Sequence, residues 1–316
     1  MSRAPQWQET PTQVHPARAY IAYVLVCFGP SLLSVGLLAG WSTLTGHRIS
    51  LLWSFLALMT VRQFTIGVVT LLYHRGICHR TLTLHPMLEY TLRVWGWLAM
   101  AIGTRTWSLT HRVHHAHADT ERDVHSPVTE GHSLWTIGRQ SIQSVIQTRE
   151  DTTLIARLGT DLPSDRLEHL IEWDCRRNFG MTGVRFPIVI TVLTSIWWAT
   201  GLPLWVAIGA AVASLPGINL SVFASTVFLV NGVAHTWGYR NYEGLDNSTN
   251  VVPIDLFGMG EAMHNNHHAR PGSANLAHRP GEVDIGFWLA KQLKKVGLVR
   301  KLKSSPSGMP GRADST

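Results

Sequence analysis

His264-Asn-Asn-His-His268 is the last of three short histidine-rich segments that decide what this chain can be. The first is His74-Arg-Gly-Ile-Cys-His79 and the second is His111-Arg-Val-His-His115; we call the three boxes one, two and three. The 316 residues contain 17 histidines, and the boxes hold eight of them. Neutral imidazole is the commonest protein ligand for metals such as iron, zinc and copper. The boxes together predict a metal site.

The spacing within each box indicates how its imidazoles are presented. Boxes two and three read H-x-x-H-H, which puts all three side chains on one face of a helix, because residues three and four apart are neighbours. His74 and His79 are five apart, and five residues turn an ideal helix through about 500°. We therefore expect box one where a helix frays or ends. Asn231-Gly-Val-Ala-His235 adds a ninth imidazole and an amide one turn away that suits a metal-bound water.

Nine imidazoles are too many for one ion and suit two. A single histidine is more often a surface or satisfied core residue, so the prediction rests on the combined pattern and not on any one member.

The composition predicts a membrane-embedded part joined to a polar catalytic part. Hydrophobic residues make up 45% of the chain and charged residues 15%, which is more apolar than an ordinary soluble enzyme. The net charge is +7, and residues 291–303 carry six of the cations. That run suits an anionic lipid surface, and a solvated tail fits it nearly as well. No nucleic-acid-binding motif accompanies it.

The three cysteines, Cys27, Cys78 and Cys175, form no C-x-x-C pair. This excludes a sulfur-rich zinc or iron–sulfur site within the chain and suits a reducing compartment. The first 18 residues are polar, with no signal-peptide pattern, so we expect the first apolar run to stay as an anchor.

Four apolar stretches predict membrane-spanning helices: residues 20–40, 51–73, 186–200 and 203–230. Arg62 near the middle of the second costs roughly 2.5 to 3.5 kcal/mol on insertion scales, so neighbouring helices or a cavity must accommodate it. Residues 87–103, which include Arg93, predict an interfacial or re-entrant helix. Residues around 149–177 alternate charged and apolar side chains, as an exposed amphipathic helix does.

The predicted topology places all three boxes on one side of the membrane, because two crossings separate boxes one and two from box three. The two opposite loops carry only Arg48, so the positive-inside rule puts both termini and the boxes in the cytoplasm. The predicted fold is an all-α integral membrane protein of four transmembrane helices with a cytoplasmic helical cap. Its segments are a polar start (1–19), spans one and two (20–73), a cytoplasmic region with boxes one and two (74–185), spans three and four (186–230), a cytoplasmic region with Asn231, His235 and box three (231–303), and a disordered tail (304–316).

These boxes, with Ala118-Asp-Thr-Glu-Arg-Asp-Val-His-Ser-Pro127 and Gly260-Glu-Ala-Met-His264, resemble those of the membrane fatty acyl desaturase family, part of the integral-membrane desaturase and hydroxylase superfamily. The resemblance covers about residues 20–277. It implies a di-iron centre that uses O₂, with Asn231 holding a metal-bound water. The implied ligands are His74, His79, His111, His114, His115, His235, His264, His267 and His268.

Four carboxylates near the boxes are candidates to accept the outer N–H of a ligand imidazole: Asp119, Glu121, Asp123 and Glu261. For Glu121 a surface salt bridge is equally consistent.

Three apolar residues are candidates for a substrate channel. Trp107, one turn before box two, matches a tryptophan that lines the acyl tunnel of animal acyl-CoA desaturases, and ordinary packing explains it equally well. Val227 and Phe228 stand where those enzymes carry threonine and tryptophan, so the position of the double bond is left open. We expect all three beside the metals in one channel.

The resemblance implies O₂-dependent desaturation of a saturated fatty acyl chain, near its middle as in delta-9 enzymes. The acyl carrier is open between coenzyme A, a carrier protein and a membrane lipid. Electrons come from a separate ferredoxin-like, rubredoxin-like or cytochrome b5-like protein, because the chain has no fused donor segment. Box three and Ser273-Ala-Asn-Leu-Ala277 look more like bacterial desaturases, which implies a bacterial inner membrane.

Two alternatives remain. A hydroxylase of an alkane or lipid uses the same boxes, and only its product distinguishes it. A metal transporter belongs to another class, but it requires ionisable ligands within the spans, whereas these cluster outside them.

Overall fold

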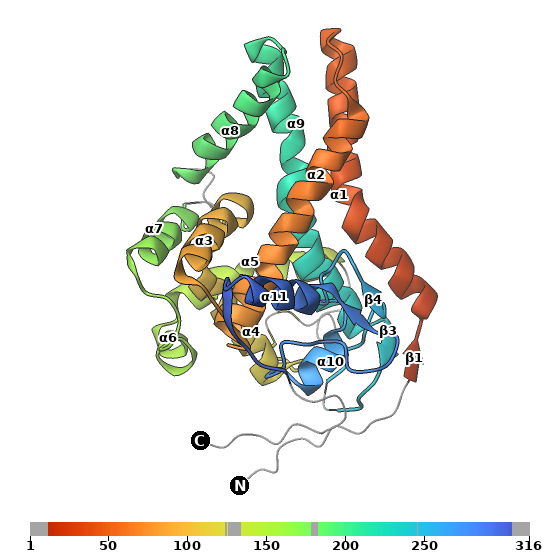
Figure 1. Cartoon of the computed structure of the whole chain (residues 1–316), viewed down its shortest axis with the longest axis vertical. Helices are drawn as coiled ribbons and strands as arrows, with labels where there is room; N and C mark the ends of the chain where they lie inside the picture. Colours follow the sequence, from red (N-terminus) through yellow and green to blue (C-terminus); the bar gives the residue numbers. More distant parts are fainter. Residues whose placement is uncertain (1–11, 124, 126–133, 178–182, 245, 305–316) are drawn as a thin grey trace.

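The computed structural model describes residues 12–123, 125, 134–177, 183–244 and 246–304 (Figure 1). Within them, three helices are long and apolar enough to cross a membrane. They are α1 (Pro16–Thr45), α2 (Leu51–Val68) with its continuation η1 (Val69–Cys78), and α9 (Leu204–Phe223) with its continuations η2 (Ala224–Gly232) and η3 (Val233–His235). The segment predicted as the third span forms α8 (Arg185–Ala199), whose 15 residues are fewer than the roughly 20 of a typical crossing.

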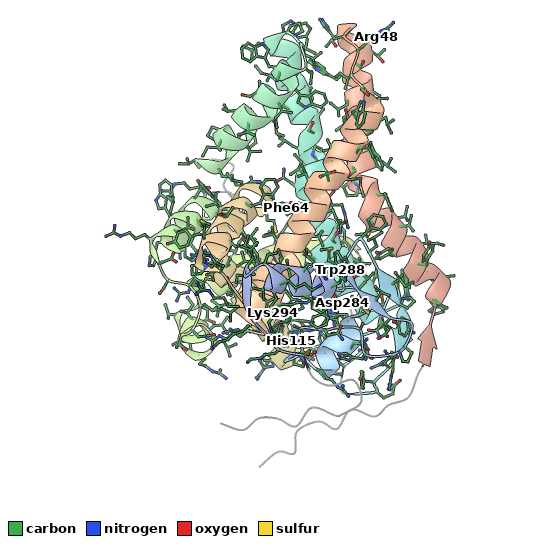
Figure 2. All side chains as sticks on the ribbon, in the orientation of Figure 1. Arg48, Phe64, His115, Asp284, Trp288 and Lys294 are labelled. Carbon is green, nitrogen blue, oxygen red and sulfur yellow. The ribbon has the colours of Figure 1, made fainter. Side chains whose placement is uncertain are left out.

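The long helices expose large apolar surfaces. In their most apolar stretches only 28% of α1, 56% of α2–η1 and 44% of α9–η3 is buried inside the protein. Leu25, Ile196, Trp198 and Leu204 are each more than half exposed. Exposed apolar surface of this extent suits contact with a lipid bilayer. Arg48 lies at the far tip of the helices, at the opposite end from His115 in the body (Figure 2).

The wider body at the other end is built mostly from shorter helices (Figure 1). These are α3 (Pro86–Met100), α4 (Thr104–His117), α5 (Leu134–Glu150), α6 (Thr152–Leu158), α7 (Arg166–Cys175), α10 (His264–Ala269) and α11 (Ile285–Lys295). The single amphipathic helix expected across residues 149–177 is wrong. Asp151 accepts a hydrogen bond from Leu154 N and Asp165 from Glu168 N, so each caps a new helix start.

In the part of the chain that the structure describes, the body also contains three short strand pairs, so the all-α prediction is wrong in this detail. The antiparallel pairs are β1 (Thr12–Val14) with β3 (Gly238–Arg240) and β2 (Leu82–Leu84) with β6 (Val299–Leu302). The parallel pair is β4 (Ile254–Asp255) with β5 (Val283–Asp284). Strands of two to four residues are too short to show an alternating hydrophobic pattern. β1 ties the N-terminal segment to residues just after His235, and β6 ties the C-terminal segment to residues just after box one.

Arg62 is accommodated by protein partners, as its place in an apolar helix requires. It is buried and donates to Phe257 O at 3.0 Å and to Ser225 Oγ at 2.9 Å. Nearby, Asp255 accepts hydrogen bonds from Tyr23 Oη at 2.8 Å and from Ala262 N at 2.9 Å. The loop that leads into box three is thereby fastened to both α1 and α2.

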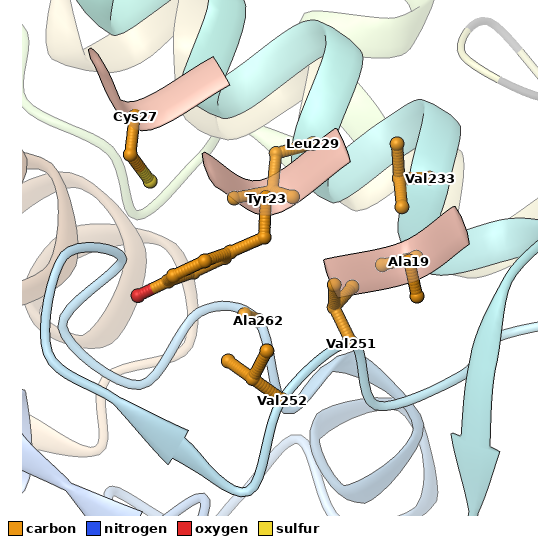
Figure 3. Close-up of a cluster of buried hydrophobic side chains, with 9 residues drawn as sticks. Ala19, Tyr23, Cys27, Leu229, Val233, Val251, Val252 and Ala262 are labelled. Carbon is orange, nitrogen blue, oxygen red and sulfur yellow. The ribbon is translucent and has the colours of Figure 1, made fainter. Parts of the chain in front are cut away.

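An apolar cluster completes this attachment (Figure 3). Tyr23 from α1 packs with Leu229 and Val233 from the end of the third long helix and with Val251 and Ala262 from the loop before box three. Burial of such side chains stabilises by about 1.5 to 3 kcal/mol each. The long helices and the box-bearing body therefore share one core.

Candidate metal centre

Box one lies on a helix that widens before it ends. The backbone of η1 winds with i→i+5 hydrogen bonds, and His79 N–H donates to His74 O at 3.0 Å. This winding makes residues five apart neighbours, so the two rings lie 4.8 Å apart, centroid to centroid. The helix ends at Cys78, as predicted, but it does not fray. Its π-helical winding brings the side chains of residues five apart together, which an ideal α-helix does not do.

The structure brings all nine predicted imidazoles into two groups, in each of which the ligand atoms lie within 4.8 Å of one another. The first group is His74, His79, His111, His115 and His267. The second group is His114, His235, His264 and His268.

Boxes two and three each divide their three imidazoles between the two groups. The first and last histidines of a box, which are four residues apart, join one group, and the middle histidine joins the other. Residues four apart stack on one helix face. Box two therefore contributes His111 and His115 to the first group, and box three contributes His264 and His268 to the second.

Carboxylates contact Nδ1 of four of these histidines and so fix the orientation of their rings. Three of these carboxylates are among those named in the sequence analysis. Asp123 contacts His114 Nδ1 at 2.9 Å, Asp119 contacts His235 Nδ1 at 3.0 Å, and Glu261 contacts His74 Nδ1 at 2.5 Å. Three of the four predicted carboxylates thus contact an imidazole of one of the two groups. Glu121 is exposed, and no described contact links it to either group.

Asp246 is the carboxylate that the sequence analysis missed. It contacts His268 Nδ1 at 2.8 Å, and its other oxygen accepts from Ser248 N and Ser248 Oγ. Aspartate two residues before serine is an ordinary turn pattern. Nothing local in the sequence distinguishes Asp246 from any other turn aspartate.

The donor set fits a bound cation. A carboxylate at Nδ1 keeps the proton on that atom, so the Nε2 lone pair points towards the middle of the group. His114 Nε2 and His268 Nε2 lie 3.3 Å apart, and both rings carry such a carboxylate. Two lone pairs at this distance repel each other unless a positive charge lies between them. The buried Nε2 atoms of His79 and His235 likewise have no hydrogen-bond partner among the described residues.

Burial keeps most of the imidazoles in the form that binds metals. It lowers the pKa of His79, His111, His264 and His267 well below the usual value, and the neighbouring imidazoles lower it further. The pKa of His268 falls to about 4 through burial, although Asp246 opposes the shift. These rings are neutral near pH 7, as metal coordination requires.

The two asparagines of box three anchor its short helix α10. Asn266 Oδ1 accepts from Asn241 Nδ2 at 2.8 Å and from Asn250 Nδ2 at 3.0 Å, and Asn266 Nδ2 donates to Glu282 Oε2 at 2.8 Å. Asn265 Oδ1 accepts from Asn241 N at 2.9 Å. Both amides are fully buried. They hold the backbone between the ligating positions, a role to which the sequence analysis assigned no residue.

A largely apolar cavity of about 450 Å³ reaches the first group, and its wall includes His74, His111 and Asn231. Trp107 lines it and stacks on His111 with ring centroids 4.9 Å apart. Val227 lines it as well. This volume lies within the roughly 300 to 1,000 Å³ typical of small-molecule sites.

Phe228 does not belong to the described cavity wall, which corrects the expectation that it lies in the channel with Trp107 and Val227. Its ring packs on Phe223 at 5.4 Å, and a Cβ at Gly138 on α5 would meet it at 3.4 Å. The expectation assumed ideal α-helical winding. The wider winding of η2 turns this side chain towards α5.

The known proteins to which this chain is similar are fatty acid desaturases. The fatty acid desaturase family model matches residues 49–279. The Delta-9 desaturase-like 5 protein of Arabidopsis thaliana is 30% identical over 239 residues, which cover 74% of this chain and 72% of the relative. Delta-9 acyl-lipid desaturase 2 of the same plant is 29% identical over 280 residues, covering 83% and 81%. Icosanoyl-CoA 5-desaturase of Limnanthes douglasii is 28% identical over 246 residues, covering 76% and 62%. The chain belongs to the fatty acid desaturase family.

Proposed function

We propose that this protein desaturates a saturated fatty acyl chain near its middle, using O₂ and electrons from a separate donor protein. The five imidazoles of the first group would hold one iron ion and the four of the second group another, and Asn231 would hold a metal-bound water. Bound iron would supply the power to oxidise an unactivated C–H bond with O₂. In balance, two C–H bonds break and a C=C double bond forms, so the acyl chain gives up two electrons and two protons. The donor supplies two further electrons, two protons come from solvent, and O₂ is reduced to two waters.

The observation that carries the proposal is that the first imidazole group forms part of the wall of the apolar cavity, through His74 and His111. Methylenes offer no hydrogen bonds, so the wall holds an acyl chain by shape alone. Trp107 and Val227 shape the wall beside His111 and Asn231. The apolar wall also excludes water from the C–H bond that is to be oxidised.

The carboxylates complete the site by holding protons at Nδ1. Asp119, Asp123, Asp246 and Glu261 fix their imidazoles in one tautomer and one orientation. These buried charges also offset the positive charge that the two ions bring.

The proposed topology keeps four crossings, with α8 as the shortest, and puts the body in the cytoplasm. The single arginine of the opposite loops, Arg48, and the many cations of the body support this orientation. The acyl carrier remains part of the test, because one relative is named for acyl lipids and another for an acyl-CoA.

The test is expression in membranes with a ferredoxin and its reductase, feeding of deuterated saturated chains as CoA thioesters or lipids, and mass spectrometry of the products. We expect a new mid-chain cis double bond and close to two irons per chain. A hydroxylated chain as the main product would establish the hydroxylase instead. One metal ion, or zinc, in fully active protein would contradict the di-iron centre.

A further inference from the structure

The exposed part of α2 is shorter than a bilayer is thick. It runs from Leu51 to Phe64, which is 49% exposed, and every residue from Thr65 to Arg75 is buried in the body. At 1.5 Å per residue this part spans roughly 20 Å, whereas the hydrocarbon core of a bilayer is about 30 Å thick. The far end cannot supply the missing length, because the charged Arg48 lies there (Figure 2). The bilayer around α2 therefore either thins or covers part of the body.

The first long helix, α1, decides between these two outcomes. Its large apolar side chains Tyr20 and Leu25 are 61% and 65% exposed. On the other side of the same helix, Tyr23 Oη donates to Asp255 Oδ1 at 2.8 Å and accepts from Phe257 N at 3.0 Å. The exposed apolar surface of α1 thus continues alongside the loop that leads into box three. A bilayer that covers this surface reaches the body at that loop.

The body presents an exposed apolar surface of its own at this level. Leu256 O accepts from Gln63 Nε2 on α2 at 2.9 Å, and Ile254 pairs with Val283 in the strand pair β4–β5. Trp288 follows on α11, which begins two residues after Val283. We call Ile254, Leu256, Val283 and Trp288 the apolar rim. Each of the four is between 39% and 60% exposed.

The helix α11 adds cations to the rim. It runs across the direction of α2 (Figure 1), as a helix does that lies in the plane of a membrane surface. Trp288, Lys291 and Lys295 are exposed and share one face, because they are three and four residues apart. Lys294 is also exposed, but six residues turn it through about 600°, away from that face. In Figure 2, Trp288 lies nearer the long helices than Lys294 does.

This combination suits the boundary between the lipid tails and the headgroups. Tryptophan has an apolar body and one N–H donor, so it favours that boundary. A lysine beside it keeps its stem against apolar groups while its ammonium reaches outwards to the phosphates. The cations make anionic headgroups the matching partners.

We propose that the apolar rim is sunk in the membrane and that Lys291 and Lys295 bind the headgroups of anionic phospholipids there. The body is then held against the bilayer by its own surface in addition to the long helices. The proposal does not depend on the reaction that the metal centre performs.

The experiment uses the full-length protein in lipid nanodiscs that hold one chain each, with the fluorophore bimane attached to Trp288→Cys. Val283→Cys provides a second label on the rim. Thr153→Cys is the control, because Thr153 is exposed on α6, at the end of the body away from the long helices (Figure 1). The three native cysteines are buried, and wild-type protein treated with bimane corrects for any label on them. One quencher is a nitroxide on the phosphatidylcholine headgroup, and the other is acrylamide in the water.

We expect the lipid nitroxide to quench both rim labels at least five times more strongly than it quenches the label on α6, and acrylamide to show the reverse order. Equal quenching of the rim and α6 labels by acrylamide would overturn the proposal, because the rim would then lie in water. Protection of the rim labels from both quenchers would also overturn it, since protein would then cover the rim.

Exchange of phosphatidylcholine for phosphatidylglycerol tests the lysines. If the rim prefers the anionic lipid, phosphatidylglycerol displaces the nitroxide lipid and restores the fluorescence at position 288. We expect Lys295→Glu, and separately Lys291→Glu, to lower this preference at least fivefold, about the effect of one cation near an anionic surface. The neighbouring change Lys294→Glu should alter it less than twofold. Equal effects at 294 and 295, or no effect at 291 and 295, would overturn the assignment of these lysines.

Discussion

The first and second imidazole groups are built from the same boxes but face different surroundings. The first group adjoins the acyl-sized cavity through His74 and His111 and approaches solvent through His79 and His115. None of the four members of the second group is among the described lining residues of that cavity. Among the described residues, Glu261 is the carboxylate that contacts an imidazole of the first group.

Three carboxylates contact the second group, through His114, His235 and His268. A carboxylate at the outer nitrogen makes an imidazole a stronger ligand and fixes its direction. We infer that the second group would hold its ion more tightly. The first group would bind its ion less tightly but be more accessible to substrate and electrons.

The largest effect is expected from removing a ligand of the buried group. His114→Ala should reduce alkene formation below detection and lower the iron content, because it deletes a donor atom that no neighbour replaces. Gas chromatography of the products and metal analysis of the purified protein measure both. His169→Ala, on the exposed face of α7, is the control and should behave as wild type. Equal losses in the two variants at equal expression would remove the site assignment.

Partial removal of metal tests the comparison itself. During slow chelation of protein loaded with two irons per chain, we expect the iron content to fall first towards one per chain, with the ion of the first group leaving earlier. Mössbauer spectroscopy of the iron-57 protein distinguishes the two sites at each stage. Simultaneous loss of both ions, or earlier loss from the second group, would contradict the inferred difference.

A single carboxylate gives an intermediate effect. Asp246→Asn keeps the shape but weakens the hold on His268, and losses of 10- to 100-fold in metal affinity are typical for such partners. Chelator competition measures this affinity. Glu121→Gln is the matched control, because Glu121 is exposed and no described contact links it to the site. Normal iron retention in the Asp246 variant would mean that this carboxylate does not support the second group.

Much of the site could be predicted from the sequence, because box spacing on a helix is a strong constraint. All nine imidazoles come together, and Asp119, Asp123 and Glu261 contact them. Asp246 could not be predicted, since its contact with His268 depends on how the loop folds over α10.

The parts of the fold that were missed share one cause: they depend on local backbone geometry. The widening of η1 at box one follows from i→i+5 bonding, which no hydrophobic period reveals. The strand pairs are too short for a pattern. The breaks between α5 and α6 and between α6 and α7 depend on two aspartate caps, Asp151 and Asp165, within a charged stretch. The long apolar helices, whose signal extends over 20 residues or more, were predicted well.

A smaller effect is expected from a substitution in the cavity wall, because the described wall includes imidazoles of the first group only. Val227→Phe places a larger side chain in the wall and should shorten the longest acyl chain that is accepted, without changing the iron content of either group. One methylene alters selectivity by about 1 to 3 kcal/mol, or 10- to 200-fold. Competition between chains of different length, read by chromatography, measures the shift. An unchanged preference would show that the chain does not pass Val227.

The smallest effect is expected from Phe228, which lies behind the wall. Its ring supports Phe223, which lines the cavity, at 5.4 Å and fills the space beside Gly138. Phe228→Leu keeps most of the apolar volume but withdraws part of that support, so Phe223 gains room to move away from the chain. We expect a small loss of selectivity for chain length or double-bond position. The loss should be smaller than the effect of one methylene, so the selectivity should change by less than about tenfold. The same chromatography, with Val227→Phe beside it, decides the order. A shift as large as that of Val227→Phe would mean that Phe228 itself contacts the chain, whereas no change at all would show that Phe223 holds its position without it.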